Sequence, residues 1–424
     1  MQPLRGTKDI LPEEIKFWQY IYNKALTILT LYNYKEIRTP IFESTTLFKR
    51  SIGNDTDIVN KEMYSFKDQG DRDITLRPEG TASIARSIIS NKLYANNQLQ
   101  KLWYLGPMFR YERPQSGRQR QFHQLGIECI GSISPMADAE VIRIATQILQ
   151  ELKYFNYRLE LNSIGNPQER SNYTEALKNY LIPYEQDLDD DSKKRLHNNT
   201  LRILDTKNTK TLEILDNAPL LNKYLEKESQ QHFQELCIYL DTLNIKYNIN
   251  PNLVRGLDYY NYTAFEIKTN HLNSQNTICG GGRYDTLIQQ LGGPNIPAVG
   301  WAIGIERLLL LIKTQLNINN TTPEIYIAAQ GEEAKKEIWH IIPILEELYI
   351  KFEINFDNNS ITKQIKKAYK SEAKFCLILG ENEIFYNTIT LKWLKLKKQE
   401  TIARIDLKNK LLNIKHETNN ITFT

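Results

Sequence analysis

The chain has 424 residues, of which 41% are hydrophobic, so it can bury a sizeable core and has room for about three domains. Its net charge is +4 and charged residues make up 25%, which excludes a uniformly polycationic protein and confines any nucleic-acid surface to a local group of lysines and arginines. The four cysteines lie far apart without a C-x-x-C pair, which argues against a zinc site and a disulfide framework and favours a reducing compartment.

The N-terminal stretch MQPLRGTKDILP has neither the apolar segment of a signal peptide nor an Arg/Ser-rich transit stretch. A run of about 18 apolar residues is also missing, so we expect a soluble protein without membrane contact that works where it is made. The abundance of Asn, Ile, Lys and Tyr beside 19 Gly indicates an AT-rich genome. Bacterial cytoplasm and plastid stroma both stay open as locations.

The first predicted elements are a helix and a strand. Glu13–Leu31 places apolar residues at helical spacing, and Tyr34–Phe42 then predicts a strand. Pro40 cannot donate to a central ladder, so an edge or interface position is expected for this strand.

A carboxylate follows at a strand-to-helix turn. Asp73–Ser90 predicts a short strand that passes through Pro78–Gly80 into a helix with an apolar face. Glu79 therefore lies at a usual place for a ligand-binding carboxylate. The alternative is that Glu79 only favours the positive N-terminal end of that helix.

The most informative stretch, Leu105–Gly131, predicts two antiparallel strands joined by the polar loop Pro114–Arg120. Side chains two apart in a strand project from the same face, so Arg110 and Glu112 point together. The same spacing groups Gln124, Gly126 and Glu128, with Gly126 leaving room for a ring between its neighbours. The loop carries Arg118 and Arg120 and almost nothing apolar, and a cationic loop beside a polar sheet face predicts a phosphate-rich ligand.

These residues carry a family resemblance. FRYE, a basic loop and RQFHQLGIE resemble motif 2 of the class II aminoacyl-tRNA synthetases in their histidyl form. TLRPEGT around Glu79 resembles the amino-acid-binding segment of that family. The first helix and the strand with Pro40 resemble motif 1, which implies a homodimer interface.

Residues 162–250 change character, with acidic and basic helical stretches and few strand signals. We predict a mainly helical insertion at about residues 166–248. It interrupts the predicted catalytic domain.

Two glycine-containing blocks follow the insertion. RGLDYY lies in Asn252–Ile267, and GGGRYD lies in Thr277–Gly293. The three glycines Gly280–Gly282 would let a substrate approach the backbone, or they form a flexible turn. In this order the two blocks resemble the histidine-specific signatures of the family.

Pro297–Ile312 predicts a small-residue strand that turns into an apolar helix with Arg307 at its start. A cation at a helix N-terminus works against the helix dipole, so a purely structural role for Arg307 is the weaker explanation. The segment resembles motif 3, whose arginine stacks on adenine and faces the γ-phosphate.

The polar stretch Lys313–Thr322 predicts a linker, and a separate domain begins near Pro323. Strands alternate with helices there, which predicts a small α/β domain on a largely parallel sheet. A lysine stripe on its second helix is either a solvated face or a nucleic-acid contact, and the resemblance to the anticodon-binding domain of histidyl-type synthetases supports the contact. The stripe consists of Lys363, Lys366, Lys367 and Lys370.

The resemblance covers essentially the whole chain. It implies an α+β catalytic domain, residues 1–321, built on the class II antiparallel sheet with flanking helices, and an α/β anticodon-binding domain, residues 322–424. The implied enzyme is a histidine–tRNA ligase that joins L-histidine to ATP as histidyl-adenylate, releases pyrophosphate and transfers histidine to the 3′-terminal ribose of tRNA(His). Both transition states concentrate negative charge on oxygen, so positioned cations should matter more than a protein base.

Matching motif positions assign the roles. The catalytic residues implied are Arg255, on the α-phosphate, and Arg110. The histidine-binding residues implied are Glu79, Gly80, Thr81, Gln124, Glu128, Tyr259 and Tyr260, with Glu128 and Tyr260 reading the imidazole. The ATP-binding residues implied are Arg110, Glu112, Arg255 and Arg307. The candidate tRNA contacts are Arg118, Arg120, Lys363, Lys366, Lys367 and Lys370.

Magnesium is expected to arrive with ATP through its phosphate oxygens, because the sequence shows no dedicated metal cage; no protein-bound zinc and no organic cofactor are expected. A regulatory, non-catalytic relative that partners ATP phosphoribosyltransferase is the alternative. That relative lacks the anticodon-binding domain, so residues 323–424 together with Glu79, Arg110 and Arg255 favour the enzyme. A purely tRNA-binding protein would leave the polar pocket without a purpose.

Overall fold

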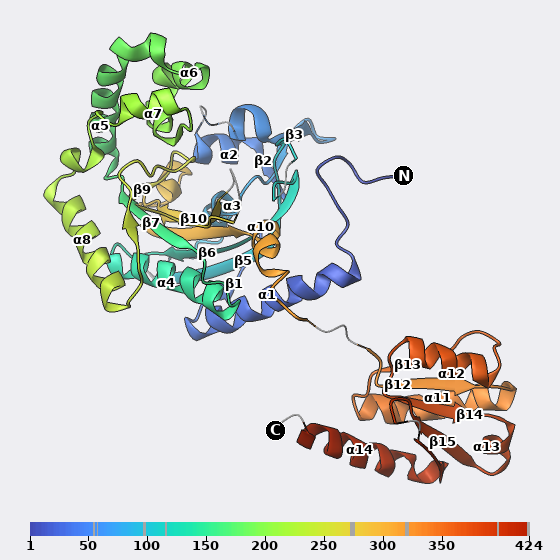
Figure 1. Cartoon of the computed structure of the whole chain (residues 1–424). Coiled ribbons are helices and arrows are strands. Elements are labelled where there is room, and N and C mark those ends of the chain that lie inside the picture. Colours follow the sequence, from blue (N-terminus) through green and yellow to red (C-terminus); the bar gives the residue numbers. More distant parts are fainter. Residues whose placement is uncertain are drawn as a thin grey trace. The chain divides into compact units, whose positions relative to one another are not determined.

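The computed structural model describes the chain except residues 54, 55, 57, 96–98, 115, 116, 272–275, 319–321, 397 and 422–424. Part of the predicted loop Pro114–Arg120 and part of the predicted linker Lys313–Thr322 thus lie outside the described residues. The chain divides into two compact units, Met1–Ile318 and Asn319–Thr424, which are described separately (Figure 1).

The first unit is built on an eight-stranded sheet in the order β1-β5-β6-β11-β10-β9-β7-β8. Its inner strands pair antiparallel, and the two outermost pairs, β1 with β5 and β7 with β8, are parallel. This confirms the predicted class II sheet. The strands are β1 Lys35–Glu36, β5 Gln100–Phe109, β6 Gln121–Ile130, β7 Arg158–Ser163, β8 Asn248–Ile249, β9 Asn261–Lys268, β10 Thr277–Arg283 and β11 Ala298–Gly304.

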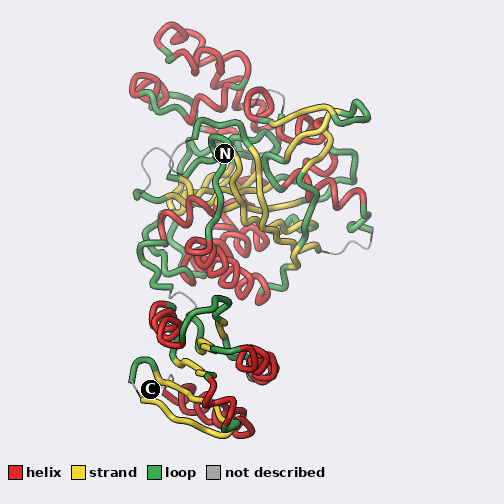
Figure 2. Tube along the Cα trace, turned by 90° about the vertical axis from the view of Figure 1, so that its right-hand side faces the viewer, coloured by secondary structure: helices red, strands yellow, loops and turns green. Residues whose placement is uncertain are grey.

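Helices cover both faces of this sheet (Figures 1 and 2). On one face α1 (Pro12–Leu31), α4 (Pro135–Glu151), α8 (Lys227–Thr242) and α10 (Ile305–Ile312) share a buried apolar core with the inner strands. The other face carries α2 Thr45–Ile52, the π-helical turn η1 Ile58–Glu62, α3 Thr81–Ser90, α9 Leu287–Gln290 and a small sheet of β2 Phe42–Ser44, β3 Tyr64–Lys67 and β4 Asp73–Leu76.

The predicted single strand Tyr34–Phe42 is wrong. The structure places its two ends in different sheets, as β1 and β2, with no ladder across residues 37–41. Pro40 has no N–H to donate, and the Arg77 guanidinium takes the neighbouring carbonyl of Thr39 at 2.9 Å. The chain therefore leaves the large sheet at this point and enters the small one.

All the regular elements between β7 and β8 are helices joined by short loops. Asn166 caps its first helix, because the side-chain oxygen of Asn166 accepts from the amides of Gln168 and Glu169, both at 2.9 Å. The Glu169 carboxylate in turn accepts from the backbone amide of Asn166 at 2.6 Å, which completes a capping box. The elements are α5 Pro167–Leu181, η2 Ile182–Asp187, α6 Asp190–Asn198, η3 Thr200–Asp205, α7 Thr209–Leu215, η4 Leu221–Tyr224 and α8.

The second unit is a five-stranded sheet in the order β13-β12-β14-β15-β16. The strands β13, β12 and β14 are parallel, and β15 and β16 continue antiparallel, so the predicted α/β domain is confirmed. Its elements are β12 Ile325–Ala329, α11 Glu332–Glu347, β13 Phe352–Ile354, α12 Ile361–Lys370, β14 Phe375–Leu379, α13 Glu381–Phe385, β15 Thr388–Trp393, β16 Lys398–Ala403, η5 Arg404–Asp406 and α14 Leu407–Ile421. Separate apolar clusters fill the two faces of this sheet.

A search for apolar helices of membrane-spanning length finds none in the described part of the chain.

Candidate active site

A cleft of about 920 Å³ opens on the polar face of the large sheet. Its walls come from β6, β9, β10 and β11, from the residues that follow β5, from the turn before α3, and from the loop that precedes β9. Ten of the predicted site residues line it: Glu79, Thr81, Arg110, Glu112, Arg118, Gln124, Arg255, Tyr259, Tyr260 and Arg307. The sequence motifs, far apart along the chain, therefore meet at one site.

The β5–β6 hairpin sets the floor of the cleft. Gln124, Gly126 and Glu128 lie two apart on β6, and Tyr104 of β5 pairs directly with Gly126. A Cβ on Gly126 would lie 2.3 Å from Cζ of Tyr104, and a Cβ on Gly80 would lie equally close. The room that Gly126 leaves is thus filled by the protein's own Tyr104 ring, which corrects the expectation that it stays open.

Glu79 caps α3 and lines the cleft at the same time. Its two carboxylate oxygens accept from the amides of Thr81 and Ala82, each at 2.7 Å. Burial raises the pKa of Glu79, against the opposing effect of these amides and of Arg110. Glu79 therefore binds the N-terminal end of α3, as the alternative stated, and it also lines the cleft.

Glu128 lies one layer behind the cleft wall and is only 1% exposed. Its carboxylate accepts from the Thr81 hydroxyl at 2.7 Å and from the Tyr284 hydroxyl. Burial raises the pKa of Glu128 to about 8. Glu128 is not among the residues that line the cleft, whereas Thr81, which it holds, is one of them.

Arg255 is held by a carboxylate that the sequence analysis missed. It forms an ion pair with Glu266 of β9, and its guanidinium lies 5.4 Å from the centre of the Tyr260 ring. Its Nε has no hydrogen-bond partner among the described residues. Glu266 and Lys268 lie two residues apart on β9, so their side chains project from the same face of the sheet. This spacing was visible in the sequence, but it does not show which arginine contacts the Glu266 carboxylate.

The glycine run of β10 serves protein packing. A Cβ on Gly280 would lie 2.3 Å from Nη2 of Arg255, and a Cβ on Gly281 would lie 2.4 Å from the carbonyl oxygen of Gly300. Gly282 would meet the carbonyl of Thr263. Only Gly280 lines the cleft, so the expectation that all three glycines admit substrate is corrected.

Three arginines converge on the other half of the cleft. Arg110 donates from Nε to the carbonyl of Pro78 at 2.9 Å, and Arg118 pairs with Glu112 at 2.8 Å. Arg307 donates to the carbonyl of Thr277. Burial lowers the pKa of Arg307, and the nearby Arg118 and Arg110 lower it further. Glu112 and Glu306 also line this part of the cleft, and the three guanidinium groups still leave an excess of positive charge there, which suits a polyanion.

The helical insertion contributes to the same cleft. Four consecutive residues, Leu204–Lys207, line it beside Asn250 and Asn252. Burial raises the pKa of Asp205, and Glu266 adds to this effect. No sequence pattern indicates that the insertion reaches the cleft, because this contact depends on how the insertion folds back over the sheet.

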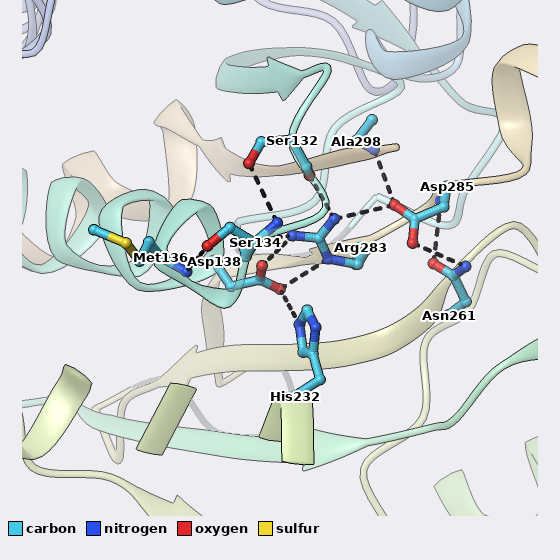
Figure 3. Close-up of polar contacts among 9 residues, drawn as sticks. All are labelled: Ser132, Ser134, Met136, Asp138, His232, Asn261, Arg283, Asp285 and Ala298. Atoms are coloured by element: carbon cyan, nitrogen blue, oxygen red, sulfur yellow. Dashed lines mark hydrogen bonds and ion pairs between the residues drawn. The ribbon is translucent and has the colours of Figure 1, made fainter. Parts of the chain in front are cut away.

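Arg283 of the GGGRYD block lies behind the site in a fully buried network (Figure 3). It pairs with Asp138 of α4 and with Asp285 at 3.2 Å, and it donates to the carbonyl of Ser132 at 2.8 Å. Asp285 in turn accepts from the amide of Ala298 at 3.0 Å. The network fixes the end of β10 to β11 and α4, so this signature arginine is structural.

The comparisons with known proteins agree with this geometry. The family described as Histidyl-tRNA synthetase matches residues 6–308, and the family described as Anticodon binding domain matches residues 324–414. The chain belongs to the histidyl-tRNA synthetase family. The second unit of the chain carries the lysines that are candidate tRNA contacts, and one of them, Lys367, pairs with Asp357.

Relatives in this family match the chain over nearly its whole length. The chloroplastic histidine–tRNA ligase of Gracilaria tenuistipitata var. liui is 68% identical over 92% of this chain and 93% of its own. The histidine–tRNA ligase of Rippkaea orientalis is 51% identical over 98% of this chain and 97% of its own. The apo structure of histidyl-tRNA synthetase from S. aureus has a TM-score of 0.81 at 39% identity and covers 97% of this chain and 99% of its own. These similarities support the ligase rather than the regulatory alternative.

Proposed function

We propose that the chain is a histidine–tRNA ligase that forms histidyl-adenylate and pyrophosphate from L-histidine and ATP and then transfers histidine to the 3′-terminal ribose of tRNA(His). The observation that carries this proposal is one cleft with an arginine-rich half, at Arg110, Arg118 and Arg307, and a second half that contains the Glu79 carboxylate. The first half matches a nucleoside triphosphate, and the second matches an amino acid with a cationic ammonium group. The first unit is then the catalytic domain and the second the anticodon-binding domain.

The arginines would act on the phosphates. In this proposal Arg110 and Arg255 contact the α-phosphate, and Arg307 covers the adenine and the γ-phosphate. Glu112 holds Arg118 at 2.8 Å and so sets the position of the loop that follows β5. Negative charge builds on the α-phosphate oxygens in the transition state, where a fixed guanidinium stabilises it without reorganisation.

The amino-acid half has polar atoms ready for a ligand. The Oε1 of Gln124 and the hydroxyl of Tyr104 are buried without a hydrogen-bond partner within the described ranges. Unpaired buried polar atoms are costly, so a substrate that supplies the partner gains affinity. Glu79, Thr81 and Gln124 would hold the ammonium group, and Tyr259 and Tyr260 would enclose the imidazole.

Glu128 would select the ring through the groups it holds. Replacing Glu128 with Ala frees the hydroxyls of Thr81 and Tyr284, so we expect the histidine KM to rise far more than the ATP KM. Arg307→Ala is the matched variant and should raise the ATP KM instead. Equal changes of both KM values in Glu128→Ala, measured by pyrophosphate exchange, would remove Glu128 from the amino-acid half.

The buried Glu128 also predicts a pH effect on stability. Its folded pKa of about 8 lies above the unfolded value of about 4.3, so its stabilising contribution is complete below the unfolded pKa and is lost as the pH rises through about 8. Glu128→Gln is neutral at every pH, so its Tm relative to the native chain should increase between pH 6 and pH 9. Exposed Glu175→Gln is the control, and a pH-independent difference for Glu128→Gln would contradict the raised pKa.

Magnesium would enter with ATP. The described residues contain no group of three or more His, Cys, Asp and Glu side chains placed to hold a metal ion. Phosphate oxygens are suitable magnesium ligands, and the cation would offset phosphate charge in the arginine-rich half.

The proposal also covers the oligomeric state of the chain, a homodimer, and its location in the cell. The segment that resembles motif 1 exposes Ile41 and Phe42, as expected of a surface that a second copy covers. The relatives are chloroplastic or bacterial ligases, which supports a plastid stroma or a bacterial cytoplasm.

Histidine-dependent exchange of pyrophosphate into ATP tests the proposal, because it needs the first half-reaction alone. We expect exchange with histidine and background with the other amino acids. Exchange with a different amino acid only, or with none, would contradict the proposed function.

A further inference from the structure

Two glutamates face each other on the large sheet, where β7 pairs with β9. Glu160 of β7 lies directly opposite Glu266 of β9, and Arg158 of β7 lies opposite Lys268. Side chains that pair in this way project from the same face with Cβ atoms about 5 Å apart, and like charges at this position are unfavourable. The two carboxylates are therefore stable side by side only with a cation between them.

Lys268 supplies that cation. Its ammonium group lies 2.7 Å from Oε2 of Glu160 and 3.2 Å from Oε2 of Glu266. Burial lowers the pKa of Lys268, but the hydrogen bonds and charges of the two glutamates outweigh this effect and raise it. The side chain of Lys268 is only 17% exposed and lines the cleft. Lys268 therefore stays charged at neutral pH and bridges the two carboxylates.

The two oxygens of the Glu266 carboxylate have different partners. Oε1 pairs with Arg255, whereas Oε2 contacts Lys268 and accepts from the Thr277 hydroxyl at 3.1 Å. Because Oε2 is held by these two groups, the carboxylate is fixed in the rotation that directs Oε1 at the guanidinium. Lys268 thus acts on Arg255 through Glu266.

Loss of Lys268 would release Glu266 rather than Glu160. Glu160 also accepts from Arg158 at 2.9 Å and from Asn250 at 2.8 Å, so its carboxylate stays in place. Repulsion from this fixed carboxylate would turn Glu266, and the guanidinium that is paired with Glu266 would move with it. A misplacement of about 1 Å at a reacting centre can lower a rate about 10²-fold.

We propose that Lys268 is a positioning residue for histidine activation, which bridges Glu160 and Glu266 and so keeps Glu266 directed at the catalytic Arg255. The inference rests on the proposed function, because it acts through the role given there to Arg255. It adds to that function a residue two positions beyond Glu266 on the same strand, outside the motifs that carry the family resemblance.

The test removes the charge of Lys268 and keeps the length of its side chain. Lys268→Met should lower kcat for histidine-dependent pyrophosphate exchange about 10–100-fold, with the histidine and ATP KM values little changed. Lys268→Arg keeps a positive charge with several N–H donors for the two carboxylates, so it should retain most of the native rate.

Lys101→Met is the matched control for the loss of a partly buried ion pair. Lys101 pairs with Glu140 at 2.7 Å, its side chain is 24% exposed, and it is not among the residues that line the cleft. Its replacement should leave kcat native. Thermal unfolding of both methionine variants shows whether either of them is destabilised.

Two double variants separate positioning from other roles of Lys268. Arg255→Ala with Lys268→Met should lose no more rate than Arg255→Ala alone, since the group that Lys268 positions is then absent. Glu160→Gln with Lys268→Met removes the repulsion, so it should fold and should recover part of the rate lost in Lys268→Met.

Several outcomes would overturn the inference. Losses that multiply in the variant without Arg255 and Lys268, together with a raised ATP KM, would assign Lys268 to a direct phosphate contact. A native kcat in Lys268→Met, an equal loss in Lys101→Met, or no recovery with Glu160→Gln would exclude positioning through Glu266. A native chain without histidine-dependent exchange would contradict the proposed function itself, so the two failures are distinguishable.

Discussion

Arg255→Ala should lower kcat for histidine-dependent pyrophosphate exchange by about 10²–10³-fold, the loss typical of removing one donor to a developing oxyanion. Histidine and ATP KM values should change much less, because the interaction strengthens mainly in the transition state. The geometry supports this role, since Arg255 lines the cleft and its Nε has no partner in the described part of the chain, while Glu266 and the Tyr260 ring hold the guanidinium.

Arg255→Lys should recover only part of the rate, because a point charge replaces a planar group that can bridge two oxygens. The Arg255→Ala chain is expected to fold, because Glu266 keeps other partners. Glu266 keeps Lys268 at 3.2 Å and the Thr277 hydroxyl at 3.1 Å after Arg255 is removed. Thermal unfolding of Arg255→Ala checks this point, and a folded variant with native exchange kinetics would remove Arg255 from the catalytic residues.

Ending the chain after Ile318 should abolish most tRNA charging and spare most histidine activation. The two units have separate apolar cores, so the first can fold without the second. All the residues that line the cleft lie in the first unit, whereas the second unit offers exposed lysines and aromatic rings for RNA. Exchange and charging rates measured on the same preparation give the comparison.

The expected order is a larger loss in charging than in exchange. The control is the full-length chain, prepared in the same way, which should carry out both reactions. A truncated chain that charges tRNA normally but fails in exchange would contradict the assignment of the second unit to tRNA.

The spacing of polar and apolar residues along the chain was sufficient to predict many of the helices and strands. The alternation of polar residues predicted the β5–β6 hairpin, although Arg110 and Glu112 themselves lie just beyond the end of β5. The helical spacing of Glu13–Leu31 and of Ile361–Ser371 predicted α1 and α12. The strand expected at Tyr34–Phe42 failed because the Arg77 guanidinium takes the neighbouring carbonyl of Thr39 and Pro40 offers no N–H. That interaction joins residues far apart in sequence, so no local pattern reveals it.

The candidate site shows the same limit. Motif spacing predicted the residues that line the cleft, but it could not show that Glu128 lies behind Thr81 or that Tyr104 occupies the space beside Gly126. Motif spacing also left the partner of Arg255 unidentified, and the structure shows that this partner is Glu266 of β9. Pairing between strands decides such contacts, and pairing is a tertiary property.

Transfer of labelled L-histidine to a tRNA(His) transcript in the presence of ATP and Mg²⁺ is the decisive measurement of the proposed ligase activity. We expect acid-precipitable histidyl-tRNA that depends on ATP and on the terminal ribose hydroxyl, and that falls by about 10²–10³-fold in Arg255→Ala where activation limits the rate. Folded full-length protein that binds ATP and tRNA yet forms no histidyl-tRNA would contradict it.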